Sequence, residues 1–207
     1  SCNNGKVSQI FYASSNEGIN WHPYPEPVLK IGRDGSWDDY NSEVPTVIKD
    51  RNILKMWYAG YSHAKSDQYN IGYATSFDGI HWNRLAANKS PYGKEGLVLT
   101  YDESKEGEFG SIADPTVVKV GEQYHMWYNG FGINMIAISH ATSKDGIKWE
   151  RDKANPVLKP SMKWEMIGAE GSVTQPAVLW NGKNFEMWYG SFADEYQRYT
   201  VISHAIS

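Results

Sequence analysis

The chain has 207 residues, with 20 Lys and Arg against 24 Asp and Glu, which gives a formal net charge of −4 at pH 7. This balance argues against a nucleic-acid partner, which requires a basic face, and no apolar run reaches the roughly 18 residues of a transmembrane segment. The length is sufficient to bury a hydrophobic core, and we expect a single domain over residues 1–207.

The first residues read Ser-Cys-Asn-Asn, and Cys2 is the only cysteine in the sequence. An internal disulfide and a cysteine-based metal cluster are therefore excluded. A cysteine at this place is typical of a processed lipoprotein, in which it carries the lipid, although an artificial chain boundary explains it equally well. Since no cationic and apolar leader precedes it, we expect any signal peptide to have been removed and the protein to be extracellular or attached to the cell surface.

A frame of twelve residues then appears three times, as "IFYASSNEGINW" from Ile10, "IGYATSFDGIHW" from Ile71 and "ISHATSKDGIKW" from Ile138. A shortened copy, "ISHAIS", begins at Ile202. Each full copy predicts a strand, a hairpin turn in which Gly takes a positive φ, and a packing Trp. A sialidase-type Asp box is the rival interpretation, but it too is a structural turn. Neither interpretation makes the aspartates of this frame catalytic.

A second frame precedes the first one three times, with a Pro, an apolar run, a polar turn and then Met-Trp-Tyr. It reads "VPTVIKDRNILKMWYAG" from Val44, "DPTVVKVGEQYHMWYNG" from Asp114 and "QPAVLWNGKNFEMWYGS" from Gln175. The two frames together describe four short strands, and no segment has a convincing helical period. Four-stranded units repeated at intervals of roughly 60 to 70 residues predict an all-β fold, a β-propeller of antiparallel blades. We place a partial blade at 7–25 and blades at about 44–85, 114–152 and 175–207.

The functional residues of a propeller are expected where the first strand of each blade begins, because these strands line the central axis. Just before the three prolines stand Glu43, Asp114 and Gln175, so the repeat varies at this place. Two carboxylates that face a common axis are the minimum set for acid/base hydrolysis of a glycosidic bond. The alternative is that Asp-Pro is an ordinary turn start and that Glu43 is a solvated loop charge.

Further residues near these strand ends are predicted to contact a ligand. These substrate-binding candidates are Gln175, Glu170, Tyr61, His63, Phe131, Asn134, Phe192 and Asp194; Glu170 is a weaker candidate among them, and Glu108 is a further weak one. His140 and His204 fall inside predicted strands without a second ligand at a suitable spacing, which favours structural roles over metal binding. We predict no metal site and no cofactor; a structural calcium ion in the central channel would be compatible with the fold.

The blade pattern resembles that of the five-bladed propeller glycoside hydrolases, the superfamily that contains families 32, 43, 62, 68 and 117. The resemblance covers nearly the whole chain. It implies that Glu43, in "SEVP", is the general acid, as in family 43, and that Asp114, in "ADP", is the base or the group that tunes the acid. In those families the aspartates come earlier in the chain than the glutamate, whereas Asp114 follows Glu43.

The resemblance implies a glycoside hydrolase-like protein that hydrolyses or recognises a glycan of the arabinan, xylan or fructan type. A non-catalytic carbohydrate-binding propeller and a protein-interaction propeller are the alternatives, so whether the protein is an enzyme stays open. A five-bladed ring needs roughly 300 residues at this repeat size. The copy in this chain is therefore incomplete, and self-association is one way to complete the propeller.

Overall fold

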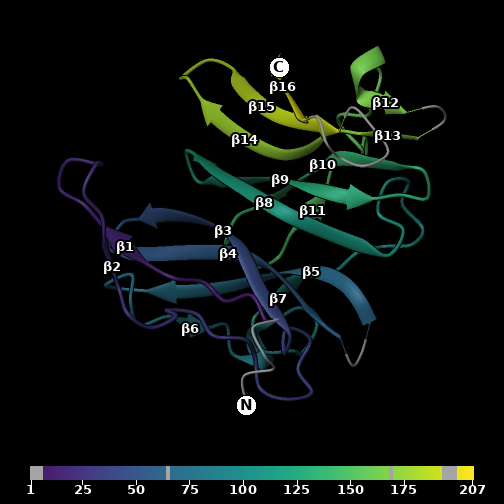
Figure 1. The fold of residues 1–207 in the computed structure, drawn as a ribbon. Helices are drawn as coiled ribbons and strands as arrows, with labels where there is room; N and C mark the ends of the chain where they lie inside the picture. The colour runs from purple at the N-terminus through teal and green to yellow at the C-terminus, as the bar shows by residue number, and fades with distance from the viewer. Residues whose placement is uncertain (1–6, 64–65, 168–169, 193–199) are drawn as a thin grey trace.

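Figure 1 shows the computed structural model of the chain, which describes residues 7–63, 66–167, 170–192 and 200–207. Three sheets, antiparallel except for one short parallel pair at the edge of the second, follow one another from the bottom of the view to the top, in chain order. The predicted all-β propeller fold is confirmed. Cys2 and Asp194 lie outside the described residues, so the expectations attached to them are not tested.

The first sheet has the strand order β3-β4-β5-β6. Strand β7 also pairs with β5, at Ile71 and Gly72, just before the part of β5 that pairs with β6. The strands of this sheet are β3 (Asn41–Asp50), β4 (Ile53–Ser62), β5 (Ser66–Ser76), β6 (Asn83–Arg84) and β7 (Leu97–Leu99). A short 3-10 helix, η1 (Ala87–Lys89), lies between β6 and β7.

The second sheet repeats the order of the first four strands, and the third contains the counterparts of the first three. The second contains β8 (Ser111–Val120), β9 (Gln123–Phe131), β10 (Met135–Ser143) and β11 (Glu150–Arg151), with β12 (Met166–Ile167) and β13 (Glu170–Ser172) added at its edge. The third contains β14 (Thr174–Trp180), β15 (Phe185–Phe192) and β16 (Thr200–Ile206). A second 3-10 helix, η2 (Lys163–Glu165), precedes β12. Strand β8 packs against the first sheet and β14 packs against β8, so the first strands β3, β8 and β14 are neighbours.

The twelve-residue frame forms the predicted hairpin and is scaffold. In the second sheet the hydroxyl of Ser143 accepts the N–H of Gly146 at 2.9 Å, and the carboxylate of Asp145 accepts two further backbone N–H groups at 2.8 Å. Gly146 has φ +79°, which a residue with a side chain rarely adopts. These contacts close the turn, as the sequence interpretation requires.

The Tyr of each Met-Trp-Tyr segment donates to a buried carboxylate. Tyr58 donates to Asp38 at 2.9 Å, Tyr128 to Glu108 at 2.7 Å and Tyr189 to Glu165 at 2.9 Å. In the first two sheets an arginine completes the group: Arg84 bonds Asp38 at 2.9 Å and Arg151 bonds Glu108 at 2.8 Å. Glu108 is fully buried in this group, so it is a structural residue and the weak expectation of a ligand contact was wrong.

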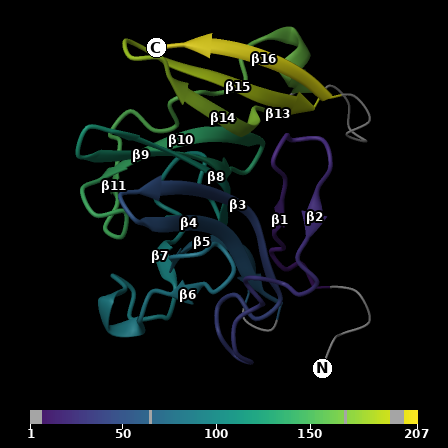
Figure 2. The same cartoon turned by 90° about the vertical axis from the view of Figure 1, so that its left-hand side faces the viewer.

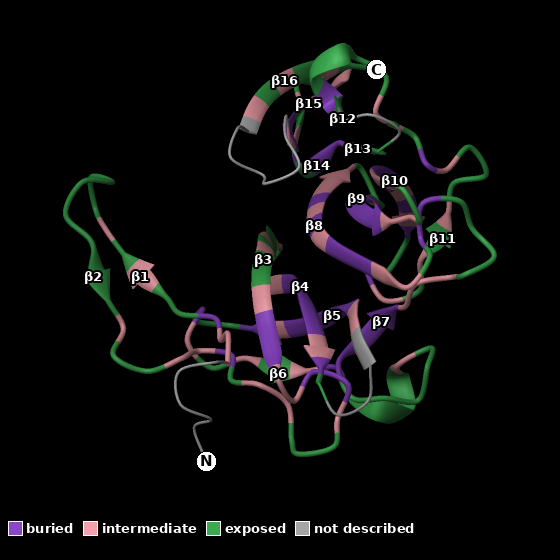
Figure 3. Cartoon of the chain, turned by 45° about the vertical axis from the view of Figure 1, so that its right-hand side comes forward, coloured by how far each residue is buried: buried purple, intermediate pink, exposed green. Residues whose placement is uncertain are grey.

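Apolar cores fill the spaces between successive sheets. The core between the first and second sheets includes Trp57, Ile71, Ile112 and Met126, all fully buried. The core between the second and third sheets is smaller and is built around Trp127. Figure 3 shows the resulting band of buried residues through β4, β5, β8 and β9.

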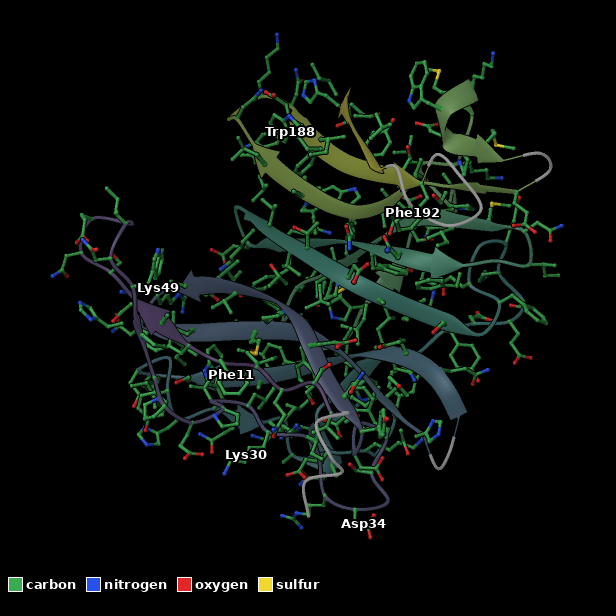
Figure 4. All side chains as sticks on the ribbon, viewed as in Figure 1. Phe11, Lys30, Asp34, Lys49, Trp188 and Phe192 are labelled. Atoms are coloured by element: carbon green, nitrogen blue, oxygen red, sulfur yellow. The ribbon has the colours of Figure 1, made fainter. Side chains whose placement is uncertain are left out.

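No further described sheet follows the third one, and the outer face of the third sheet exposes large apolar side chains. Trp188, at the position of Trp57 and Trp127 in the repeat, is 39% exposed, and Figure 4 shows it on the uppermost sheet. Leu179, Ile202 and Ile206 are exposed too, on strands that pair with or flank β15. No helix among the described residues has the length and apolar character needed to cross a membrane.

The N-terminal hairpin, which we define as residues 13–23, contains β1 (Ala13–Ser14) and β2 (His22–Pro23). It pairs only with itself in the described sheets and stands apart from the three sheets in Figures 2 and 3. It corresponds to the partial blade that the sequence places at 7–25.

Candidate functional site

A β-bulge interrupts each first strand at the same place, immediately before the proline. The residues at this place, Val44, Asp114 and Gln175, have φ of +49°, +51° and +52°. The register of each first strand shifts there relative to its partner strand. A bulge redirects the side chains beside it, and here it does so at the start of all three strands that neighbour one another. We call the region around Glu43, Asp114 and Gln175 the axial site.

Glu43 is half-buried on β3 and is held by a tyrosine that the sequence analysis missed. The hydroxyl of Tyr69 donates to Glu43 Oε1 at 2.5 Å, and the side-chain amide of Asn41 donates to the Tyr69 oxygen at 3.4 Å. Burial, followed by the hydrogen bond to Glu43, raises the pKa of Tyr69 well above its ordinary range, so the phenol stays a donor. The backbone N–H of Tyr69 donates to the hydroxyl of Ser111 at 2.7 Å, which ties this arrangement to the start of β8.

Asp114 is half-buried on β8, and its carboxyl pKa is raised. Burial is the larger cause and the charge of Glu43 is the second, and together they raise the pKa of Asp114 to about 6. The two carboxylates predicted as catalytic are therefore close enough to influence one another, from strands of two different sheets. Burial and a neighbouring negative charge both disfavour the ionised form of a carboxyl group. Both therefore favour the protonated form of Asp114.

Asn129 joins Asp114 to the third sheet, and it too was missed. Its side-chain N–H₂ donates to Asp114 Oδ2 at 2.6 Å and to the hydroxyl of Thr174 at 2.5 Å. Its side-chain oxygen accepts the backbone N–H of Gln175 at 3.0 Å. Because an N–H group can only donate, the bond from Gln175 fixes which end of the Asn129 amide faces Asp114. Asp114 Oδ2 is consequently an acceptor, and a proton on this carboxyl resides on Oδ1.

A signal for Asn129 does exist in the sequence. The residue after Met-Trp-Tyr is Ala59 in the first sheet, Asn129 in the second and Gly190 in the third. The small residues in the first and third sheets are consistent with a crowded strand position. An amide side chain at the same position in the second sheet breaks this pattern and indicates a role other than packing. Asn129 is fully buried, and the cost of burying its amide is offset by the three hydrogen bonds.

Three predicted ligand contacts lie at the ends of second strands. Tyr61 pairs with Asn41 and Phe131 pairs with Ser111, so both stand opposite the first residue of a first strand. Phe192 ends β15 and is labelled in Figure 4 beside the third sheet. All three side chains are half-buried. The ring of Tyr61 lies 4.6 Å from that of Tyr69, which connects it to the contacts of Glu43.

The remaining predicted contacts are more peripheral. His63 is exposed and stacks on Tyr40 at 5.1 Å between ring centroids. Asn134 is exposed, and its backbone oxygen accepts the N–H of Gly171 at 3.2 Å. Glu170 is exposed at the start of β13. Gln175 exposes its side chain at the axial site, whereas its backbone is held by Asn129.

The predicted structural histidine of the second sheet lies in a ring cluster. His140 packs against Trp127 at 4.8 Å and stands 3.2 Å from a ring nitrogen of His125. Burial lowers the pKa of both imidazoles. Within the described ranges, no three His, Cys, Asp or Glu side chains come together as a metal site would require.

Comparison with known proteins gives no matching family profile. The uncharacterized protein MT1551 of Mycobacterium tuberculosis (strain CDC 1551 / Oshkosh) is 24% identical over 188 residues, which are 86% of this chain and 57% of that protein. A 1,2-beta-oligomannan phosphorylase of Thermoanaerobacter sp. (strain X514) is 32% identical over 134 residues, 61% of this chain and 42% of that protein. The chain thus spans about half the length of the curated relatives it matches.

Solved structures give a wider match. A glycoside hydrolase superposes with a TM-score of 0.72 at 20% identity, over 95% of this chain and 56% of that protein. A thermostable family-43 glycoside hydrolase superposes with a TM-score of 0.69 at 16% identity, over 98% of this chain and 62% of that protein. The fold is therefore that of the five-bladed β-propeller glycoside hydrolases, and this chain forms a part of it. The resemblance predicted from the blade pattern is confirmed at the level of the fold.

Proposed function

We propose that the axial site acts on a glycan and transfers a proton at a glycosidic bond, with Glu43 and Asp114 as the working pair. The observation that carries the proposal is the raised pKa of Asp114, about 6, caused by burial and then by the charge of Glu43. A carboxyl that keeps its proton in mildly acidic solution, up to about pH 6, and that interacts with a second carboxylate is the arrangement that glycosidic acid/base chemistry needs.

The contacts favour one division of roles within the pair. Asp114 Oδ2 accepts from Asn129, so Oδ1 holds the proton that would pass to the departing glycosidic oxygen as the C–O bond breaks. Glu43, positioned by Tyr69, would accept the proton of the incoming hydroxyl group, which is water in hydrolysis. In this proposal Asp114 is the acid, whereas the family resemblance implied that role for Glu43.

The substrate within the glycan class is a further part of the proposal. Arabinan, xylan and fructan were expected from the resemblance to families 43, 62, 32 and 68. The name of the oligomannan phosphorylase relative adds β-1,2-linked mannosides, with phosphate as an acceptor in place of water. Asp114 would serve as the acid with either acceptor, because in both reactions the departing oxygen takes up a proton. Phosphate is already an anion and needs no base, so Glu43 would be needed as a base only when water is the acceptor.

A non-catalytic carbohydrate-binding propeller is the second candidate. Gln175 supports it, because in the third sheet an exposed amide stands at the position that Asp114 occupies in the second, so a third carboxylate is missing there. Amides bind sugar hydroxyl groups but neither donate nor accept a full proton at neutral pH. A protein-interaction propeller is a third candidate, which the exposed apolar face of the third sheet supports.

A panel of aryl glycosides tests the proposal. We expect turnover of an arabinofuranoside, xyloside, fructoside or mannoside, measured with and without phosphate. Both Glu43→Gln and Asp114→Asn should lower the rate by at least about 100-fold, the usual contribution of a positioned acid or base. Glu122→Gln is the matched control, because Glu122 is an exposed turn residue. Oligosaccharide binding without turnover would replace the enzyme by the binding protein, and absence of both would reject both.

We also propose that the protein works outside the cell or on its surface, with Cys2 as the lipid-bearing residue. Labelling of the full-length protein with a fatty-acid analogue tests this. The label should be lost in Cys2→Ser, and label that persists in this variant would contradict the assignment.

A further inference from the structure

A cavity of about 680 Å³ lies between the first and second sheets, and we call it the inter-sheet cavity. Its lining includes Asn70 of β5, Leu97 of β7 and Arg151 of β11, together with residues of the two loops that flank β7. All lining residues lie between positions 37 and 151, so the first two sheets and their loops form the walls. The volume is within the range of about 300 to 1,000 Å³ that is typical of small-molecule sites.

Asn70 lines this cavity with an acceptor that is not used within the protein. The residue is only 9% exposed, and its side-chain N–H₂ donates to the backbone oxygen of Gln68 at 3.1 Å. Its side-chain oxygen accepts no hydrogen bond from any residue that the structure describes. Because the polar groups of nearly buried side chains are usually hydrogen-bonded, this oxygen indicates a partner that carries a donor.

Tyr92 forms an aromatic wall of the cavity and is held in place by its own turn. Its backbone N–H donates to the hydroxyl of Ser90 at 3.1 Å, and this hydroxyl donates to the backbone oxygen of Leu97 at 2.6 Å. Gly93 follows with φ +64°, which closes the turn. Tyr92 is 39% exposed, and its hydroxyl group bonds no described residue. An aromatic face with a free hydroxyl group suits a ligand that has both C–H faces and polar groups.

A second wall of the cavity, the segment 100–103, is also fixed. Arg151 donates to the backbone oxygen of Thr100. Asp102 Oδ1 accepts the hydroxyl of Ser104 at 2.7 Å and its backbone N–H at 3.0 Å, which leaves Oδ2 for a ligand. The bond from the hydroxyl, followed by the bond from the N–H, lowers the pKa of Asp102, so its carboxylate is ionised at neutral pH.

The charges of the lining favour a neutral ligand. The guanidinium of Arg151 is neutralised by Glu108, which is fully buried and pairs with it at 2.8 Å. Lys94 then supplies one positive charge, whereas Asp102 and Glu103 supply two negative charges. The remaining balance is negative and disfavours phosphate groups and uronic acids. A neutral ligand rich in hydroxyl groups avoids this repulsion and can use both the ammonium donor and the carboxylate acceptors.

The inter-sheet cavity and the axial site share strand β5. Side chains alternate along a strand, so Tyr69 and Asn70 point to opposite faces of β5. Tyr69 holds Glu43 in the axial site, whereas Asn70 lines the cavity. The two sites are therefore distinct, and two successive residues of one strand connect them.

We propose that the inter-sheet cavity is a second carbohydrate site, which binds one unit of a neutral glycan beside the axial site. Tyr92 stacks on a face of the sugar ring. Asn70 and Asp102 accept hydrogen bonds from its hydroxyl groups, and Lys94 donates to them. The choice of a carbohydrate rests on the function proposed above for the axial site, since the lining alone indicates only a neutral ligand rich in hydroxyl groups.

Isothermal titration calorimetry of the whole chain tests the proposal, in the Asp114→Asn background so that bound glycans are not cleaved. The probes are neutral arabino-, xylo-, fructo- and β-1,2-manno-oligosaccharides. We expect Tyr92→Ala, folded by circular dichroism, to weaken the tightest of them by at least about 10-fold, as loss of an aromatic anchor does. Phe77→Ala is the matched control, because Phe77 is 81% exposed and does not line the cavity. Equal affinity in Tyr92→Ala and its parent would overturn the proposal.

The results for the two sites are distinguishable. Binding that depends on Tyr92, in a wild type that turns over no aryl glycoside, would support the cavity and reject the chemistry of the axial site. Turnover by the wild type with binding that is independent of Tyr92 would do the reverse. Absence of binding for every neutral oligosaccharide would overturn the cavity proposal.

Glu103→Lys tests the charge argument at an exposed residue. The substitution makes the balance of the lining positive, so it should raise the affinity for an oligogalacturonide by about 10-fold at low salt. The affinity for neutral oligosaccharides should change little. A wild type that binds the oligogalacturonide more tightly than every neutral probe would contradict the assignment to a neutral glycan.

Discussion

Replacing Asp114 by Asn removes the titrating carboxyl of the axial site and keeps its hydrogen bond. The amide oxygen of the new side chain accepts from Asn129 as Oδ2 does, at a position where the distance is 2.6 Å. Asn also tolerates the left-handed backbone that position 114 adopts, with φ +51°. The variant therefore isolates the effect of one ionisation on the stability of the fold.

The size of the effect follows from the raised pKa. The carboxyl of Asp114 titrates near 6 in the folded chain and near its ordinary value of 3.8 in the unfolded chain. The pKa of Asp114 is therefore roughly two units higher in the folded chain than in the unfolded chain. This difference corresponds to about 3 kcal/mol of stability for the protonated form. This contribution is fully present below pH 3.8, because both states are then protonated. It is lost as the pH rises through 6, so the variant gains up to about 3 kcal/mol relative to the wild type above that pH.

Urea unfolding at a series of pH values from 4 to 8 measures this difference. The gap between the free energies of unfolding of the two proteins should change by about 3 kcal/mol over that range and flatten above pH 7. A second variant, Glu43→Gln, removes the smaller of the two causes, so the pKa of Asp114 should fall in it only partly. A gap between wild type and Asp114→Asn that is independent of pH would refute the reasoning.

Two further substitutions test the contacts around the site and the scaffold. Tyr69→Phe removes the 2.5 Å hydrogen bond to Glu43 and should cost about 1 to 2 kcal/mol in urea unfolding while weakening glycan binding; an unchanged stability would show that this bond contributes nothing. Gly146→Ala should cost at least about 3 kcal/mol, since it adds a 2.7 Å approach to Trp57 to the strain of a positive φ. Gly18→Ala, with the same φ and no atom within reach, should cost only about 1 kcal/mol, and equal losses in both would contradict the packing argument.

The scaffold could be predicted because its signals are local. The strand, turn and tryptophan of "ISHATSKDGIKW" lie within twelve residues, and the turn is closed by contacts among Ser143, Asp145 and Gly146. Repetition then converts one local pattern into three sheets. The fold class and the neighbourhood of Glu43 and Asp114 followed from this, since equal units place equal strand ends side by side.

The partners of the site residues could not be predicted in the same way. Tyr69 reaches Glu43 from 26 residues away, and Asn129 contacts Thr174 across 45 residues. Glu108 stands in a loop whose sequence resembles that of a binding segment, yet its carboxylate is fully buried against Tyr128. Nothing in the spacing of one sequence separates an acidic residue that faces the axis from one that anchors a strand.

The bulge before each proline explains how a repeated scaffold acquires a varied site. Val44 has φ +49°, a costly conformation for a β-branched residue. Its exposed aliphatic side chain cannot act as an acid, a base or a hydrogen-bond partner. The bulge is therefore a property of the blade that persists without a functional residue. Where Asp114 stands in the same conformation, the bulge places a carboxyl close to Glu43 from the neighbouring sheet, and where Gln175 stands it places an amide. Chemistry can then change by substitution at one position per blade, while the strand pairing on either side of it remains the same.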